Sequence, residues 1–186
     1  LTFADDINNA GQILGDYRDG SGIFHGYLLD GGVFNTFDAP GATNTRTGGL
    51  NDLSQIVGGY RDGSGIFHGY LLDGGVFSTV DVPGAVHTFQ SGINDAGQMV
   101  GDYDATPVFM ESRHGYFFDG SVFHTIDPPG SDLTLTSGIT NSGQIVGNYL
   151  DGSGISHGYL LDWDGGDFSM INVPDAVHTT AADINA

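Results

Sequence analysis

The sequence contains no cysteine and no lysine, and basic residues of any kind are rare. Without cysteine the chain forms no disulfide and no thiolate metal site, and its redox compartment stays undecided. Four arginines stand against 23 acidic residues in 186, which gives a formal net charge of -19. Such a surface repels phosphate backbones and anionic headgroups, so we expect no nucleic-acid partner. Cations and polar neutral ligands suit this charge better.

Long apolar runs and enzyme signatures are also missing. No stretch is long enough to span a bilayer, no basic-then-apolar leader opens the chain, and we expect no membrane insertion. The first residue is Leu1 rather than methionine, which suggests a mature, trimmed or excised product. The motifs G-x-S-x-G, H-E-x-x-H and the P-loop are absent, and Glu111 is the single glutamate. We therefore expect a protein that is not an enzyme.

What the sequence does contain is a tandem repeat. The glutamine of "GQILG", "SQIVG", "GQMVG" and "GQIVG" returns at intervals of 43, 43 and 46 residues, and the "HGY" step and a proline mark return with it. We expect one repeat domain over 1–186, because 39% hydrophobic and 11% aromatic residues exclude a disordered acidic tail. Its units are approximately 1–43, 44–87, 88–132 and 133–177.

Each unit consists of four short apolar runs separated by turns rich in Gly, Asn, Asp and Pro. Connections this short permit only antiparallel neighbours, which excludes a parallel β-helix. Four-stranded antiparallel units of about 43 residues are typical of propeller blades. The sequence therefore predicts an all-β, four-bladed β-propeller-like array, with a β-sandwich or a fragment of a larger propeller as alternatives. Small residues at Gly49, Gly92 and Gly138 mark the expected innermost strand.

Three motifs, "INDAGQMVGDY", "HGYFFDG" and "FHTIDPPG", resemble bacterial extracellular repeats of the HAF family. That family is named for a His-Ala-Phe step, which stands here as His-Gly-Tyr. The resemblance covers essentially the whole chain. It implies repeat-built β structure and a bacterial extracellular or cell-surface location, and it implies no particular activity.

Histidine and aspartate recur at positions that invite a metal or catalytic interpretation. One histidine per unit stands in the "HGY" step, and because the units hold these residues apart we expect each to bond a turn backbone instead. The histidines are His25, His68, His114 and His157. Carboxylates beside glycine turns could bind Ca²⁺, although no unit has full D-x-D-x-D spacing and ordinary turn capping is the competing explanation. The metal candidates are Asp16, Asp19, Asp102, Asp104 and Asp151.

Two departures from the repeat stand out. Apolar residues replace turn residues at Phe109, Met110 and Trp163, where they form either a binding patch or an inward plug. Residues 178–186 repeat 1–10, so that a seventeenth strand follows four complete units. The array is then a piece of a longer one, or the strand is redundant, or it completes a blade in a neighbouring molecule. Candidate subunit contacts are Leu1, Thr2, Phe3, Thr179, Thr180 and Ile184.

These features predict a secreted or surface structural protein whose partner is itself, joined head to tail by strand exchange into filaments. The alternative is a glycan- or calcium-binding propeller module with a polysaccharide partner. A hydrolase is the third hypothesis, because paired aspartates serve glycosidases, but nothing selects one pair.

Overall fold

Strands and turns of the repeat form four separate antiparallel sheets. The computed structural model describes residues 1–107 and 113–185, and in these residues there are sixteen strands. Blade 1 contains β1 (Asp6–Ile7), β2 (Ile13–Arg18), β3 (Phe24–Asp30) and β4 (Val33–Phe37). Blade 2 contains β5 (Asn44–Leu50), β6 (Ile56–Arg61), β7 (Phe67–Asp73) and β8 (Val76–Thr79). Blade 3 contains β9 (His87–Ile93), β10 (Met99–Asp104), β11 (Arg113–Phe118) and β12 (Phe123–Ile126). Blade 4 contains β13 (Ser131–Ile139), β14 (Gln144–Asp151), β15 (Ser156–Asp162) and β16 (Asp167–Ile171).

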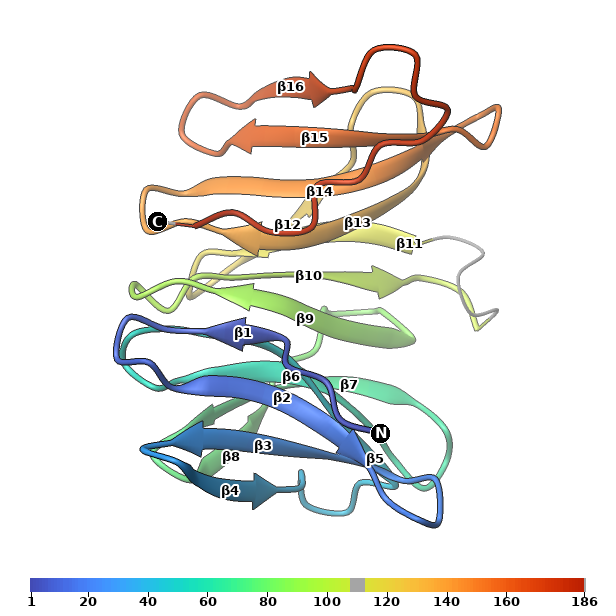
Figure 1. Ribbon diagram of the computed structural model, residues 1–186. Helices are drawn as coiled ribbons and strands as arrows, with labels where there is room; N and C mark the ends of the chain where they lie inside the picture. The colour runs from blue at the N-terminus through green and yellow to red at the C-terminus, as the bar shows by residue number, and fades with distance from the viewer. Residues whose placement is uncertain (108–112, 186) are drawn as a thin grey trace.

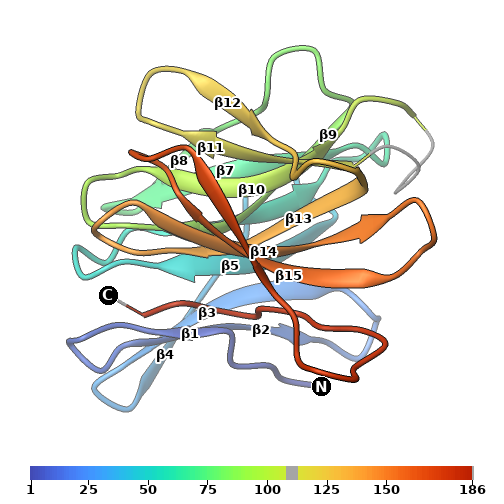
Figure 2. The same cartoon turned by 90° about the horizontal axis from the view of Figure 1, so that it is seen from above.

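Each sheet follows chain order from its innermost to its outermost strand, which confirms the four-bladed, propeller-like array. The first strand of each later blade packs on the two middle strands of the blade before it: β5 on β2 and β3, β9 on β6 and β7, and β13 on β10 and β11. Figure 1 shows the sheets stacked face to face, with β4 and β16 at opposite ends. Figure 2 shows the same blades from above.

Glycine permits the innermost strands to meet backbone to backbone. A Cβ built on Gly49 would lie 2.9 Å from the Cα of Gly92, and a Cβ on Gly92 would lie 3.3 Å from the Cα of Gly138. Any side chain here would push neighbouring blades apart, because backbone atoms cannot rotate out of its way. The predicted innermost position of these glycines is confirmed.

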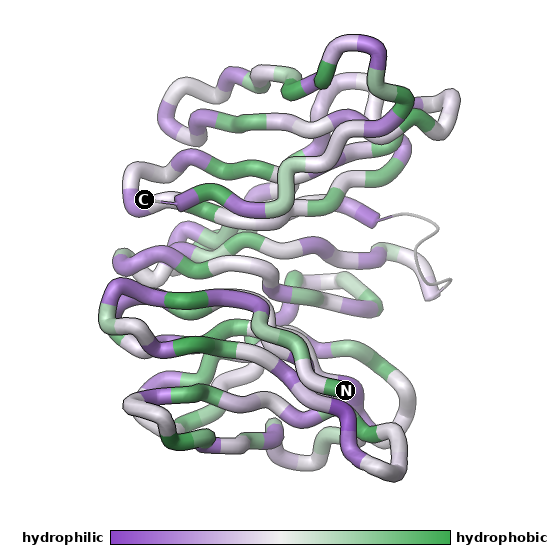
Figure 3. Tube along the Cα trace, in the orientation of Figure 1, coloured by the Kyte–Doolittle hydropathy of each residue, from purple (hydrophilic) through white to green (hydrophobic). Residues whose placement is uncertain are grey.

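Apolar side chains lie on both faces of the middle strands because each sheet is covered by its neighbours. A tyrosine on the third strand of each blade is buried. Tyr70 and Tyr159 donate their hydroxyl to a carbonyl of their own blade's innermost strand, and Tyr27 donates to the carbonyl of Phe3, just before β1. Figure 3 shows hydrophobic stretches within the strands and hydrophilic residues at several of the turns. The β4 strand is mostly exposed, as expected for an outermost strand.

The C-terminal segment, residues 178–185, follows blade 4 and corrects the expectation of a seventeenth strand. It is not a β-strand, because it pairs with no strand among residues 1–107 and 113–185. It packs on the chain's own fourth blade: the Thr179 amide donates to the Ser156 carbonyl at 2.9 Å, and the Ser156 amide donates to His178 Nδ1 at 3.1 Å. The same contact joins Phe67 to His87 between blades 2 and 3. The segment therefore occupies the innermost position of a next blade (Figure 1).

Candidate functional site

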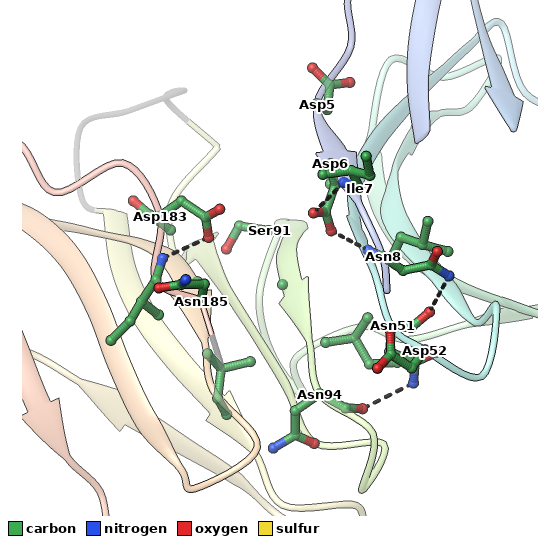
Figure 4. Close-up of a pocket in the computed structure, with 18 of the residues that line it drawn as sticks. Asp5, Asp6, Ile7, Asn8, Asn51, Asp52, Ser91, Asn94, Asp183 and Asn185 are labelled. Carbon is green, nitrogen blue, oxygen red and sulfur yellow. Dashed lines mark hydrogen bonds between the residues drawn. The ribbon is translucent and has the colours of Figure 1, made fainter. Parts of the chain in front are cut away.

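The innermost strands and the C-terminal segment enclose a polar cavity of about 420 Å³, which we call the axial cavity. Its wall takes equivalent residues from β1, β5, β9, β13 and the C-terminal segment. Figure 4 shows Asp6 and Asp183 on opposite walls, with Ser91 between them and Asn94 at one end. The described lining residues include aspartate, asparagine, serine and glycine, and none of them is basic.

A ladder of asparagines holds one end of this wall together. Asn8, Asn51 and Asn94 each donate their side-chain amide to the backbone carbonyl of the equivalent residue in the next blade, at 3.0 to 3.1 Å. Each also accepts backbone N–H bonds from its own turn, as at Gln12 and Gln55. Sequence reasoning missed this ladder, although the repeated "IN" step contained the signal.

Two aspartates replace the inner-strand glycine at the two ends of the array, and these were missed as well. Asp6 and Asp183 stand where the middle units have glycine. Asp6 accepts the amides of Ile7 and Leu50, both at 2.7 Å, and Asp183 accepts that of Ile184 at the same distance. Burial raises the pKa of Asp6, and the negative charges of Asp183 and Asp5 raise it further. The bonds from the two amides lower it in part. The cavity thus concentrates negative charge, which attracts hydrogen-bond donors of a ligand.

The chemistry of this wall is hydrogen bonding without a metal cluster. Among the residues described, no group of three or more His, Cys, Asp or Glu is placed to hold a metal ion. Carboxylates accept only, hydroxyls and amides both donate and accept, and together they match the hydroxyl groups of a polar ligand.

The aspartates proposed as calcium ligands have other partners. Asp19 accepts the amides of Ser21 and Ile23, and Asp151 caps the equivalent turn of blade 4, as the turn-capping explanation predicts. Asp16 is buried and accepts Arg46 Nε at 2.6 Å. These residues lie in different blades or turns and do not converge on one ion.

The remaining two candidates, Asp102 and Asp104, enclose one arginine. Arg113 lies 3.1 Å from the first and 3.2 Å from the second, and its guanidinium stacks on Phe89 at 4.6 Å. Burial raises the pKa of Asp102 to about 7, with a smaller contribution from the charge of Asp104 and against the opposing charge of Arg113. This group is a buried ion cluster of blade 3, in which both carboxylates face Arg113.

The four histidines bond carboxylate or amide side chains, which corrects the expectation of a turn-backbone partner. His25, His68 and His114 place Nδ1 at 2.7 to 2.9 Å from the aspartate that precedes the proline turn, thirteen residues later. His157 meets Asn172 instead, at 3.0 Å. Each imidazole also lies against a tyrosine of the second strand, with ring centroids 5.1 to 5.4 Å apart. The histidines remain separate, one in each blade.

Of the residues in the predicted apolar patch, Trp163 is described, and its side chain packs inward. The Trp163 ring is half-buried, with its centroid 4.4 Å from Phe117 and 5.0 Å from His124, so it plugs the interface between blades 3 and 4. Phe109 and Met110 lie outside the described residues.

The predicted subunit contacts are placed within the chain. Leu1, Thr2 and Phe3 run beside β2, where the Phe3 amide donates to the Asp16 carbonyl at 2.8 Å. Thr179 contacts blade 4, and Ile184 lies beside Gly138 on the neighbouring inner strand. Thr180 follows in the same C-terminal segment.

A second cavity, of about 530 Å³, lies between the proline turn of blade 2 and blade 3. Its lining combines the aromatic residues Tyr103, Phe123 and His124 with the hydroxyl of Thr125. Tyr103 already bonds Thr125 at 3.1 Å, and His124 bonds Asp119 at 2.9 Å. Its polar groups are therefore largely paired, and its lining is more apolar than that of the axial cavity.

The chain is similar to known proteins in its fold alone. No family model and no curated protein matches the chain. Similar solved structures include a protein assigned as TolB from Agrobacterium tumefaciens (TM-score 0.66, 15% identity, 88% of this chain and 62% of that one). A mutant Aleuria aurantia lectin in complex with α-methyl-L-fucoside is similar too (0.53, 14%, 87% and 56%), as is a Burkholderia pseudomallei lectin (0.51, 12%, 92% and 57%).

The chain spans about three-fifths of the length of these structures. In the part of the chain that the structure describes, no helix has the length and apolarity to cross a membrane. The chain shares the all-β architecture of the β-propeller lectins and TolB.

Proposed function

We propose that the chain is a carbohydrate-binding module that holds a neutral sugar in the axial cavity. The observation that carries this proposal is the wall itself, in which each unit and the C-terminal segment contribute polar residues at equivalent repeat positions to one space of about 420 Å³. Ligand pockets usually have volumes of about 300–1,000 Å³, so a mono- or disaccharide suits this one. The lectin folds among the similar structures support the proposal.

Charge selects the class of sugar. Asp5, Asp6 and Asp183 line the cavity and the chain carries a net charge of -19, so uronic and sialic acids are repelled. Neutral sugars donate several hydroxyl hydrogens to carboxylate acceptors, and such charge-assisted bonds are stronger than neutral ones. The module therefore binds neutral glycans and leaves them chemically unchanged.

Calorimetric titration of residues 1–186 with neutral and anionic sugars tests this. The neutral panel includes α-methyl-L-fucoside and a methyl galactoside, and glucuronic acid is the anionic probe. We expect binding of a neutral sugar only. Ser137→Tyr, which fills the cavity, and Asp183→Asn, which removes a carboxylate, should each weaken it by about tenfold or more.

Asp164→Asn is the matched control for charge, because Asp164 is exposed in a turn remote from the cavity. It should leave affinity unchanged. Binding that survives both cavity variants, or no binding of any neutral sugar by the folded chain, would contradict the proposal. Equal binding of glucuronic acid would contradict the electrostatic selection.

A further inference from the structure

Blade 1 exposes apolar side chains that the other blades bury. Ile7 is 63% exposed, whereas Leu50, Ile93 and Ile139 at the same repeat position are buried. These three are covered by the blade that precedes them in the chain, as Leu50 is by Leu14. Nothing among the described residues covers blade 1 in this way. Its open face is thus a repeat of an interface that the chain forms three times within itself.

The outer strand of blade 1 is likewise not covered by a neighbouring blade among the described residues. Phe34 is 61% exposed, while its equivalent Phe77 packs against Phe37 of the preceding blade with ring centroids 6.2 Å apart. At the far end of the array, Ile171 occupies the position of Phe37 and is 39% exposed. The two ends of one chain are therefore complementary halves of the blade-to-blade contact.

The innermost strands at the two ends are complementary in a second way. β1 is only two residues long, and pairs Asp6 with Leu14 and Ile7 with Ile13 of β2. The C-terminal segment repeats the same Asp-Ile-Asn sequence and packs on blade 4. At one end, β2 pairs with β1 and with the residues before it. At the other end, the C-terminal segment has the same sequence step and pairs with no strand in the part of the chain that the structure describes.

We propose that two copies of this chain join head to tail by exchanging this strand. The C-terminal segment of one copy replaces residues 1–8 of the second and pairs with its β2, while blade 4 of the first copy covers blade 1 of the second. The repeat fixes the register: Thr179 lies opposite Tyr17, Asp183 opposite Leu14 and Ile184 opposite Ile13.

Charge favours this occupant over the strand it replaces. Asp5 adds to the negative charge around Asp16 and raises its pKa together with burial, which is the largest cause. The residue that takes the place of Asp5 after exchange is Ala182, so the repulsion disappears while Arg46 keeps its bond to Asp16. The exchange also preserves the backbone bonds of β2, because main-chain groups do not depend on side-chain identity.

The contact is heterologous, since it joins two different surfaces of the same chain. Such contacts close into rings when their rotation permits and otherwise extend into filaments. Either product has a mass above that of the single chain, and this makes the oligomeric state the direct observable.

Light scattering of residues 1–186 over a concentration series is the first test. We expect masses that rise to two copies or more, and monomers for a chain ending at Val177. Phe34→Asp, which places a charge on the contact face, should also shift the protein to monomer. A folded monomer for the unaltered chain at every concentration would overturn the proposal, as would oligomers that survive both alterations.

Cross-linking tests the register, and the absence of native cysteine makes it clean. Directly opposite residues of antiparallel strands lie about 4.5–5.5 Å apart, within the range that a disulfide spans. Ile13→Cys mixed with Ile184→Cys should give a disulfide-linked dimer. The matched control is Ile56→Cys with Ile184→Cys, because Ile56 pairs with Leu50 of β5, a strand that the exchange leaves in place. Equal linkage in the two mixtures would overturn the proposed exchange. A third variant carries both Ile13→Cys and Ile184→Cys, and a disulfide that forms only within each such chain would overturn it as well.

Discussion

Replacing Gly49 with alanine tests whether neighbouring inner strands meet backbone to backbone. The added Cβ would lie 2.9 Å from the Cα of Gly92 and 3.2 Å from backbone atoms of Ser91 and Ile93. β5 and β9 must separate to admit it. Overpacking of this kind costs about 1–3 kcal/mol. The lower entropy of the unfolded alanine chain recovers up to about 1 kcal/mol. A glycine-to-alanine control without a clash gains the same entropy, so Gly49→Ala should be less stable than that control by about 1–3 kcal/mol.

Urea unfolding followed by far-ultraviolet circular dichroism measures this difference. Gly20→Ala is the matched control, because a Cβ there meets no atom within 4 Å and the residue has no positive φ. It should be neutral or slightly stabilising. In thermal unfolding we expect Gly49→Ala to lower Tm by about 2–4 °C for each kcal/mol lost. Equal unfolding midpoints for the two variants would refute backbone contact at the axis.

Three further predictions concern charged groups. Burial raises the pKa of Asp102 to about 7 from 3.8, so the folded state holds the proton more tightly and stability should fall as pH rises between these values; Asp102→Asn should flatten that slope in urea midpoints. Arg46→Met leaves the buried Asp16 unpaired and should cost about 1–3 kcal/mol, and adding Asp16→Asn should restore part of it if pairing is the cause. The hydrogen bonds to Asn172 and Asp151 raise the pKa of His157 above 6.5, so its stabilisation should be complete below pH 6.5 and lost as pH rises through the raised pKa. NMR titration measures this pKa, and Asn172→Ala should lower it.

The repeat made the architecture predictable from sequence. Turn glycines and prolines at fixed offsets limit the connections to antiparallel ones, and the length of the unit then leaves few all-β solutions. Gly49, Gly92 and Gly138 identified the innermost strand because only a missing side chain permits that approach. These are local properties, which one sequence can reveal.

Partners across the blades could not be predicted in the same way. The pairing of His25 with Asp38 depends on the register of β3 and β4 within one blade, whereas the bond of Arg46 to Asp16 of the previous blade depends on how the sheets stack. The aspartates at 6 and 183 had a signal, since they replace a repeated glycine, but their meeting across one cavity depends on the curvature of the array. Whether Trp163 packs inward also depends on the neighbouring blade, because its ring contacts Phe117 of blade 3.

Amide chemical-shift mapping with a neutral sugar tests the central claim most directly. We predict shifts that cluster on the inner strands around Asp6, Gly92 and Asp183, because these line the axial cavity. Shifts concentrated instead at Tyr103 and Thr125 would place the site between blades 2 and 3 and contradict the account, as would a folded protein whose spectrum no neutral sugar changes.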